Sequence, residues 1–236
     1  MNPSLAVSLR NVYETLAISA PTVVDALRGT VTKAACDARL ERWSRACLRN
    51  ARIELDVTGR DHMAPGATYL VMSNHQSLYD IPVLFQAVGP NIRMITKREL
   101  FRVPIFGGAL DAAGFIAIDR SDRNAAIRSL HRARELLASG THVWIAPEGT
   151  RSLDGALLPF KKGAFYLALE AGLPILPVTL QGTRSILPAR GFRSDPGHRV
   201  RVTIHSFVDP VPYAARGKAG RADLMEHVRH VMESAL

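Results

Sequence analysis

The chain has 236 residues, of which 47% are hydrophobic, so it is long enough to bury the core of one domain. A formal net charge of +9 at pH 7 predicts an anionic partner, such as nucleic acid, an anionic lipid or an acidic carrier protein. Aromatic residues make up only 6% of the chain and no nucleic-acid-binding motif is found, which argues against nucleic acid as the partner. Two cysteines, Cys36 and Cys47, are too few for a disulfide framework and indicate a reducing compartment.

Residues 1–50 have the pattern of helices. Apolar residues recur at helical spacing from Leu5 to Leu16, and we expect Pro21 to end this first helix. The stretch from Cys36 to Ala51 is amphipathic, with Leu40, Trp43 and Cys47 along its apolar side. Its opposite side carries a stripe of arginines within an arc of ~140°: Arg39, Arg42, Arg45, Arg49 and Arg52. Such a stripe is typical either of the solvated face of a helix docked on its own core or of a helix at an anionic membrane surface. We find no cleavable leader and no run of about 18 apolar residues, so we expect no spanning helix.

From Ile53 onward, strand and helix patterns alternate. Strands are predicted at 53–58, 69–72, 92–95, 115–118, 142–145, 175–180 and 200–207. Helices are predicted at 81–88, 104–113, 124–137, 162–171 and 223–232. We expect Gly107 and Gly108 to break the second of these helices and Ser121 to cap the third. Residues 183–196 are turn-rich. The alternation predicts an α/β fold with a largely parallel sheet flanked by helices.

The polar stretch from Ser73 to Asp80 follows a predicted strand and precedes a predicted helix, where open α/β sheets place their chemistry. On a single helix His75 and Asp80 would lie ~140° apart, so they can meet only if His75 lies in the loop and the helix begins near Ser77. The carboxylate would then hold one imidazole nitrogen and leave the other as a general base. Ser77 and Asp80 also fit a capping box, in which Asp80 only starts the helix.

A second polar stretch, from Ala146 to Ser152, follows the strand predicted at 142–145. Taken alone, it reads as a proline-initiated turn with solvated Glu148 and Arg151.

Together these stretches resemble the glycerolipid acyltransferase family, the lysophosphatidic acid acyltransferases. The family's first block, N-H-x-S-x-x-D, is matched by Asn74, His75, Ser77 and Asp80. Its second block ends in isoleucine-aspartate-arginine, as do residues 118–120. Its third block, F-P-E-G-T-R-S, is matched from Pro147 to Ser152, with Ala146 in place of the usual phenylalanine. The fourth, a short apolar-proline block, resembles residues 175–178. Four blocks in the right order over residues 74–178 are far more specific than any one of them.

The resemblance implies transfer of a fatty acyl group from acyl-CoA or acyl-carrier protein to the free hydroxyl of a lysophospholipid. The implied acceptor is 1-acyl-glycerol 3-phosphate, giving phosphatidic acid, with another lysolipid or glycerol 3-phosphate as alternatives. His75 would be the general base, oriented by Asp80. The resemblance assigns the acceptor's glycerol phosphate to Glu148, Gly149, Thr150 and Arg151. Arg151 suits this role, because a guanidinium binds a phosphate with two hydrogen bonds. The backbone amides of Gly149 and Thr150 are candidate donors to the developing oxyanion of the thioester. Two further basic residues each follow a predicted strand and are either phosphate ligands or solvated surface charges: Lys97 and Arg120. We expect no metal and no cofactor besides the acyl donor.

A lipid substrate favours the membrane interpretation of the arginine stripe. We therefore expect residues 1–50 to be a membrane-association segment and residues 51–236 to be the acyltransferase domain, with an anionic membrane surface as partner. The protein would be peripheral and monotopic on the cytoplasmic face of the membrane. The rival of a different class is a non-catalytic membrane lipid-binding protein, which would have no need of the pair formed by His75 and Asp80. The motifs of serine hydrolases, nucleotide-binding loops and zinc sites are missing from the sequence.

Overall fold

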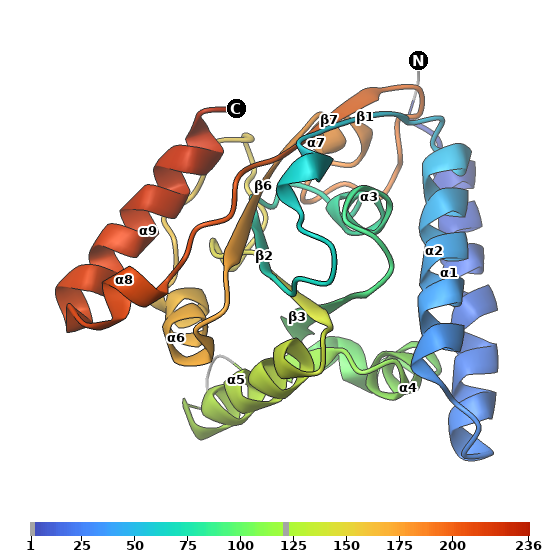
Figure 1. The fold of residues 1–236 in the computed structure, drawn as a ribbon. Helices are drawn as coiled ribbons and strands as arrows, with labels where there is room; N and C mark the ends of the chain where they lie inside the picture. The colour runs from blue at the N-terminus through green and yellow to red at the C-terminus, as the bar shows by residue number, and fades with distance from the viewer. Residues whose placement is uncertain (1–2, 120–122) are drawn as a thin grey trace.

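A largely parallel β-sheet forms the centre of the protein in a computed structural model that describes residues 3–119 and 123–236 (Figure 1). Its strands are β1 (Glu54–Thr58), β2 (Leu70–Ser73), β3 (Ile92–Lys97), β4 (Ile116–Ile118), β5 (His142–Ile145), β6 (Ile175–Gln181) and β7 (Arg199–Ile204). Within the described residues the strand order is β1-β7-β6-β2-β5-β3-β4. Each neighbouring pair is parallel except β6 and β7, which are antiparallel. The predicted α/β class, with its largely parallel sheet, is confirmed.

Helices cover both faces of the sheet. They are α1 (Leu5–Leu27), α2 (Lys33–Asn50), α3 (Asp80–Ala87), α4 (Phe106–Ala112), α5 (Arg123–Ala138), α6 (Lys162–Ala171), α7 (Thr183–Ile186), α8 (Val211–Ala214) and α9 (Gly217–Glu233). Alternate residues of β2 point to opposite faces: Val71 packs with α1 to α4, whereas Leu70 and Met72 pack with α5, α6 and α9. The strand that leads to His75 is therefore buried on both sides.

Two glycines and a proline expected to interrupt helices lie inside them instead. Helix α1 continues through Pro21, because its buried contacts on both sides of the proline, such as Ile18 and Thr22, outweigh the ~3 kcal/mol that an interior proline costs. Helix α4 contains both Gly107 and Gly108. A Cβ atom at Gly107 would lie 2.1 Å from the carbonyl oxygen of Phe101, so this glycine permits a close approach rather than a break.

Other boundaries also differ from the prediction. Helix α9 begins at Gly217, six residues before the predicted start at Asp223. Residues 183–186 form the short helix α7 within the segment that was expected to be turn-rich. Ser121, the expected cap of α5, lies outside the described residues.

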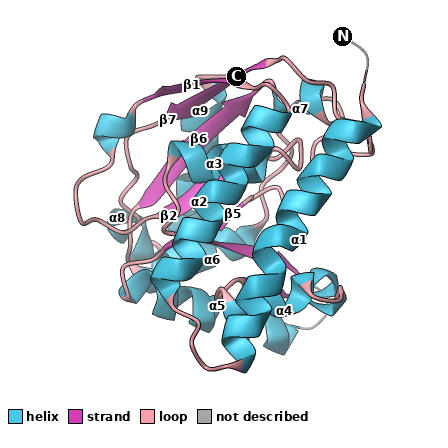
Figure 2. Ribbon diagram, turned by 90° about the vertical axis from the view of Figure 1, so that its right-hand side faces the viewer, coloured by secondary structure: helices cyan, strands magenta, loops and turns pink. Residues whose placement is uncertain are grey.

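Helices α1 and α2 form a layer at one side of the molecule, against α3 and α4 (Figure 2). Leu40 and Cys47 of α2 are buried, as the amphipathic pattern predicted. Arg39 departs from the predicted stripe, because its guanidinium lies 2.5 Å from the carboxylate of Asp25 and bridges α2 to α1. None of the helices formed by residues 3–119 and 123–236 is long and apolar enough to cross a membrane.

The outer side of α1 is apolar. Its large exposed apolar residues fall within an arc of ~120° on a helical wheel: Leu5, Leu9, Val12, Tyr13, Leu16, Val24 and Leu27. Their exposure ranges from 42% at Val24 to 84% at Leu27. A row of large apolar side chains of this length on one helix is typical of an interaction surface.

Candidate active site

The loop that carries His75 leaves the centre of the sheet at the end of β2. Asn74 ties this loop to β6 through both of its amide atoms. Its Nδ2 donates to the carbonyl oxygen of Leu180 at 2.9 Å, and its Oδ1 accepts from the backbone nitrogen of Leu180 at 2.7 Å. Gln76 donates to the same carbonyl through Nε2 at 2.6 Å. The side chains on either side of His75 therefore continue the pairing of β2 with β6 beyond Ser73.

His75 and Asp80 are in contact. Nδ1 of the imidazole lies 2.7 Å from Oδ2 of the carboxylate, with His75 in the loop and Asp80 at the first position of α3. The same oxygen accepts from the backbone nitrogens of Gln76 at 2.7 Å and Ser77 at 2.9 Å. Asp80 therefore contacts the imidazole and also accepts from the turn before α3. Only this half of the capping box forms, because the hydroxyl of Ser77 donates to the carbonyl oxygen of Leu187, and α3 begins at Asp80 rather than near Ser77. Asp80 is fully buried, whereas 17% of the His75 side chain is exposed, and Nε2 is the nitrogen left for a substrate.

Two residues that sequence reasoning missed also define this site. Trp144 of β5 meets the imidazole of His75 edge-on, with ring centroids 5.6 Å apart and an interplanar angle of 87°. Its Nε1 donates to the hydroxyl of Ser73 at 2.9 Å. Thr183 donates its hydroxyl to Oδ1 of Asp80 at 2.5 Å. Both lie near the carboxyl ends of β5 and β6, the two neighbours of β2, where side chains converge, so only a known strand order could have singled them out.

Glu148 lies beneath the site rather than at its surface. It is buried, and its two carboxylate oxygens accept from backbone nitrogens: Oε1 from His75 at 2.7 Å and Oε2 from Leu158 at 2.8 Å. Burial raises the pKa of this carboxyl, while the two backbone hydrogen bonds act in the opposite direction. Because both oxygens are engaged within the protein, the geometry favours a role for Glu148 in holding the loops over contact with a substrate.

The rest of the second loop faces outward next to His75. Gly149 adopts a left-handed conformation with φ of 74°, and its backbone nitrogen closes a turn onto Ala146 at 3.0 Å. Thr150 is exposed and Arg151 is partly exposed. The backbone nitrogen of Ser152 donates to the carbonyl oxygen of His75 at 2.8 Å, which holds Arg151 beside the histidine loop. Among the described residues, no carboxylate forms an ion pair with Arg151.

Of the two other basic residues considered as phosphate ligands, Lys97 and Arg120, the structure describes only Lys97. Lys97 is exposed at the carboxyl end of β3, and β5 lies between β3 and β2. It therefore shares the edge of the sheet from which His75 emerges, but no contact joins it to the loop of His75 within the described part of the chain. Arg120 lies outside the described residues.

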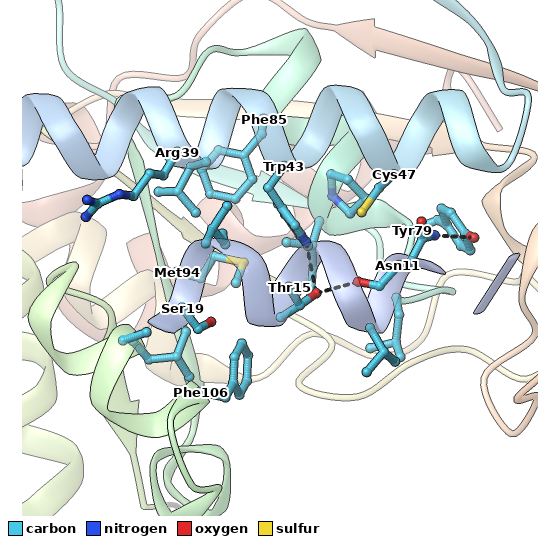
Figure 3. Close-up of a pocket in the computed structure, with 18 of the residues that line it drawn as sticks. Asn11, Thr15, Ser19, Arg39, Trp43, Cys47, Tyr79, Phe85, Met94 and Phe106 are labelled. Atoms are coloured by element: carbon cyan, nitrogen blue, oxygen red, sulfur yellow. Dashed lines mark hydrogen bonds between the residues drawn. The ribbon is translucent and has the colours of Figure 1, made fainter. Parts of the chain in front are cut away.

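An apolar cavity of about 440 Å³ lies between α1, α2, α3 and α4. Tyr79, the neighbour of Asp80, lies toward one end, and Met94 and Phe106 lie toward the other (Figure 3). A row of hydrogen-bonded polar groups follows one side. Trp43 Nε1 donates to the hydroxyl of Thr15 at 3.0 Å, and Asn11 Nδ2 donates to the hydroxyl of Tyr79 at 2.8 Å (Figure 3). The cavity thus combines apolar walls with a few satisfied polar groups, as small-molecule and lipid sites do.

No cluster of three histidine, cysteine, aspartate or glutamate side chains that could hold a metal ion occurs in the described ranges 3–119 and 123–236. The two cysteines are buried and unpaired with each other. Burial raises the pKa of the Cys47 thiol to about 12.

Residues 54–181 match the family model described as Acyltransferase, and this match includes both loops of the site. A 1-acyl-sn-glycerol-3-phosphate acyltransferase of Chlamydomonas reinhardtii is 38% identical over 168 residues, which cover 70% of this chain and 50% of that protein. The human 1-acyl-sn-glycerol-3-phosphate acyltransferase alpha is 36% identical over 182 residues, covering 76% of this chain and 62% of that protein. The chain thus spans about half the length of the first of these relatives.

A solved structure shows the same fold over nearly the whole chain. The crystal structure of the 1-acyl-sn-glycerophosphate acyltransferase PlsC from Thermotoga maritima superimposes with a TM-score of 0.73 at 26% identity. The match covers 96% of each chain, so it includes the layer formed by α1 and α2 as well as the sheet.

Proposed function

The chain belongs to the acyltransferase family, and on that premise we propose that it transfers a fatty acyl group to the free hydroxyl of 1-acyl-sn-glycerol 3-phosphate, giving phosphatidic acid. The observation that carries the proposal is the contact of 2.7 Å between His75 Nδ1 and a fully buried Asp80 carboxylate. The acyl donor is a thioester, acyl-CoA or acyl-carrier protein, and we expect the reaction to require no further cofactor.

In the proposed reaction His75 acts as general base. An alcohol near neutral pH is a poor nucleophile, so Nε2 of His75 takes the proton of the acceptor hydroxyl as its oxygen attacks the thioester carbonyl. Asp80 holds the tautomer that leaves Nε2 unprotonated and then stabilises the imidazolium. When the carbon–sulfur bond breaks, the imidazolium returns the proton to the leaving thiolate. Backbone amides of Gly149 and Thr150 remain the proposed donors to the oxyanion.

We assign the phosphate of the acceptor to the loop that carries Arg151. The backbone of Arg151 lies next to the loop of His75, because Glu148 and Ser152 on either side of it bind the two backbone groups of His75. A guanidinium gives a dianionic phosphate two parallel hydrogen bonds. In this assignment Gly149 and Thr150 shape the loop, Glu148 holds it from below, and Lys97 is a more distant source of positive charge.

The apolar cavity suits a fatty acyl chain. It begins near Tyr79, adjacent to the proposed catalytic pair, and is lined mainly by α1, α2, α3 and α4, with Met94 of β3 and Leu187 of the loop after α7 completing the wall. Two of these helices, α1 and α2, belong to the predicted membrane-association segment. An acyl chain would therefore lie between this segment and the sheet while the reacting carbonyl is near His75.

We propose that the same segment, residues 1–50, associates with a membrane surface, and that residues 51–236 supply the chemistry. The exposed apolar row of α1 can enter the interfacial region, and Arg42, Arg45 and Arg49 on the exposed side of α2 can contact anionic headgroups. Because the acceptor and product are lipids of the membrane, this places the site where its substrates are. We propose the cytoplasmic face, where acyl-CoA and acyl-carrier protein are found.

A non-catalytic lipid-binding protein is the rival function, and one assay separates the two. The purified protein is offered 1-acyl-glycerol 3-phosphate, other lysolipids and glycerol 3-phosphate with each donor, and products are measured by mass. We expect phosphatidic acid to form, His75→Ala to lose ~10⁴-fold in kcat while remaining folded, and Asp80→Asn to lose less. Normal turnover by folded His75→Ala protein, or lipid binding without turnover by the unmodified protein, would sink the proposal.

A further inference from the structure

We propose that Thr183 is a positioning residue of this active site, which holds the carboxylate of Asp80 in the orientation that His75 requires. The inference rests on the proposed function of the pair formed by His75 and Asp80. Its hydroxyl donates to Oδ1 of Asp80 at 2.5 Å, and both side chains are completely buried.

The two oxygens of Asp80 are held in different ways. Oδ2 accepts from the imidazole of His75 and from two backbone nitrogens of its own loop, those of Gln76 and Ser77. Oδ1 accepts from Thr183, and no other donor to this oxygen is found among the described residues. The three donors hold one oxygen of the carboxylate, and the hydroxyl of Thr183 holds the other. The plane of the carboxylate is therefore fixed from both sides.

The backbone before Thr183 is built to deliver the hydroxyl. Gly182, at the end of β6, has a φ of 93°, and a Cβ atom there would lie 2.4 Å from the carbonyl oxygen of Arg199. Only glycine fits this turn without displacing β7. The turn places Thr183 at the start of α7, two residues after the end of the strand that also holds Asn74 and Gln76 through Leu180. One end of β6 therefore supports the loop of His75 at three points.

The alternative is that Thr183 only satisfies a buried oxygen and thereby stabilises the fold. The two roles predict different kinetics. A positioning residue affects kcat and the pH dependence of the reaction while leaving KM nearly unchanged, because it touches neither substrate. A residue that only stabilises the fold lowers the melting temperature and leaves the kinetics of the remaining folded protein unaltered.

The decisive variant is Thr183→Val, which keeps the shape of the side chain and removes the hydroxyl, with Thr183→Ser as the conservative variant. We expect Thr183→Val to lose at least tenfold in kcat with little change in KM, and Thr183→Ser to retain most of the activity. Without the hydroxyl, Oδ1 keeps more negative charge, which favours the protonated imidazole. The acidic side of the pH–rate profile should therefore move to higher pH in Thr183→Val.

A matched control lies on the same strand. Thr179 is equally buried, and its hydroxyl donates to the carbonyl oxygen of Met232 at 2.8 Å on the face of the sheet covered by α9. Thr179→Val should lower the melting temperature but leave kcat and the pH profile of the folded protein as they are. Combining Thr183→Val with Asp80→Asn should cost little beyond Asp80→Asn alone, because the threonine acts through the aspartate.

Several outcomes would overturn the proposal. These are an unchanged kcat and pH profile in folded Thr183→Val protein, a full additional loss in the double variant, or a Thr183→Val effect no different from that of Thr179→Val. If Thr183→Val does not fold, Thr183→Ala is measured in its place, and failure of both to fold would assign the threonine to folding alone. The activity of the unmodified protein and its loss in His75→Ala test the proposed function separately.

Discussion

A carboxylate oxygen of Glu148 lies 2.7 Å from the backbone nitrogen of His75, so one loop of the site holds the main chain of the other. The second oxygen of Glu148 holds the nitrogen of Leu158 at 2.8 Å. A carboxylate can accept on both sides, whereas an amide has one accepting oxygen and one donating nitrogen. This difference makes glutamine a sharp test of the role of Glu148.

We expect Glu148→Gln to destabilise the protein by roughly 1–3 kcal/mol, because one buried backbone N–H loses its acceptor and faces another donor. It should also lower kcat, because the loop of His75 loosens, while the KM for the acceptor changes little. Denaturant unfolding and steady-state kinetics measure the two effects. An increase confined to the acceptor KM would instead assign Glu148 to substrate contact, as the family resemblance suggested.

Arg151→Ala should chiefly raise the KM for the acceptor, by tenfold or more, because a charge-assisted pair with the phosphate is lost. Arg151→Lys should recover only part of this loss, since an ammonium cannot form two parallel bonds with one phosphate. The donor KM is the internal control and should stay nearly constant. A rise in the donor KM alone would show that the phosphate assignment is wrong.

Ser19→Phe should shorten the preferred acyl chain. Ser19 is buried on the side of α1 that lines the cavity, in the region of Met94 and Phe106, so a phenyl ring there would fill space that a long chain uses (Figure 3). Leu16→Phe is the matched control, because Leu16 lies on the exposed side of the same helix. Competition between acyl donors of different length measures the preference. The cavity assignment fails if both variants keep the chain-length profile of the unmodified protein.

Vesicle binding should depend on two different faces of residues 1–50. Replacing Arg42, Arg45 and Arg49 by glutamine should weaken binding to anionic vesicles by about 100-fold at low salt, since each basic residue contributes about 1 kcal/mol. Replacing Leu9, Tyr13 and Leu16 by serine should weaken binding at every salt concentration, because the apolar contribution is not screened. Arg39 is left unchanged, because its ion pair with Asp25 joins α2 to α1.

Co-sedimentation across a salt series measures both sets, with Arg132→Gln on α5, across the sheet, as a control for net charge. Binding that is unaltered in both triple variants would mean that these faces are merely solvated. Activity on detergent-dispersed substrate should persist in each variant, which separates membrane binding from chemistry.

Stability should fall in mild acid partly because of His142. Burial lowers the pKa of this histidine, whose Nδ1 accepts from the backbone nitrogen of Tyr69 at 3.1 Å. The unfolded chain therefore takes up the proton first, so the contribution is complete above about pH 6.5 and is lost as the pH falls toward the folded pKa. His142→Asn keeps an acceptor and cannot titrate. Its melting temperature should fall less between pH 7 and 5 than that of the unmodified protein, and an equal fall would contradict this explanation.

Periodicity was sufficient to predict the sheet, because a strand buried on both faces is a short apolar run bounded by polar loops. The prediction that Pro21 and Gly107 interrupt helices was wrong. Packing against other elements stabilises both helices despite the low helix propensity of these residues, and the neighbouring sequence does not show that packing. The spacing of His75 and Asp80 allowed their contact on the condition that His75 lies in the loop, and it left a capping role for Asp80 open. The roles of Trp144 and Thr183 did not follow from spacing, because they depend on which strands are neighbours, and strand order is a property of the whole chain. Arg39 illustrates the same limit, since its partner lies 14 residues away on another helix.

The amide of Asn74 takes the place of a peptide group of a neighbouring strand, which limits the changes in chain length that the protein tolerates here. His75 is the next residue, so its place is inherited from the alignment of β2 against β6 rather than from the loop. Adding or deleting one residue before Asn74 would turn the side chains that follow it, including the imidazole of His75, toward the opposite face of the sheet. The length of chain between Tyr69 and Asp80 should therefore vary little.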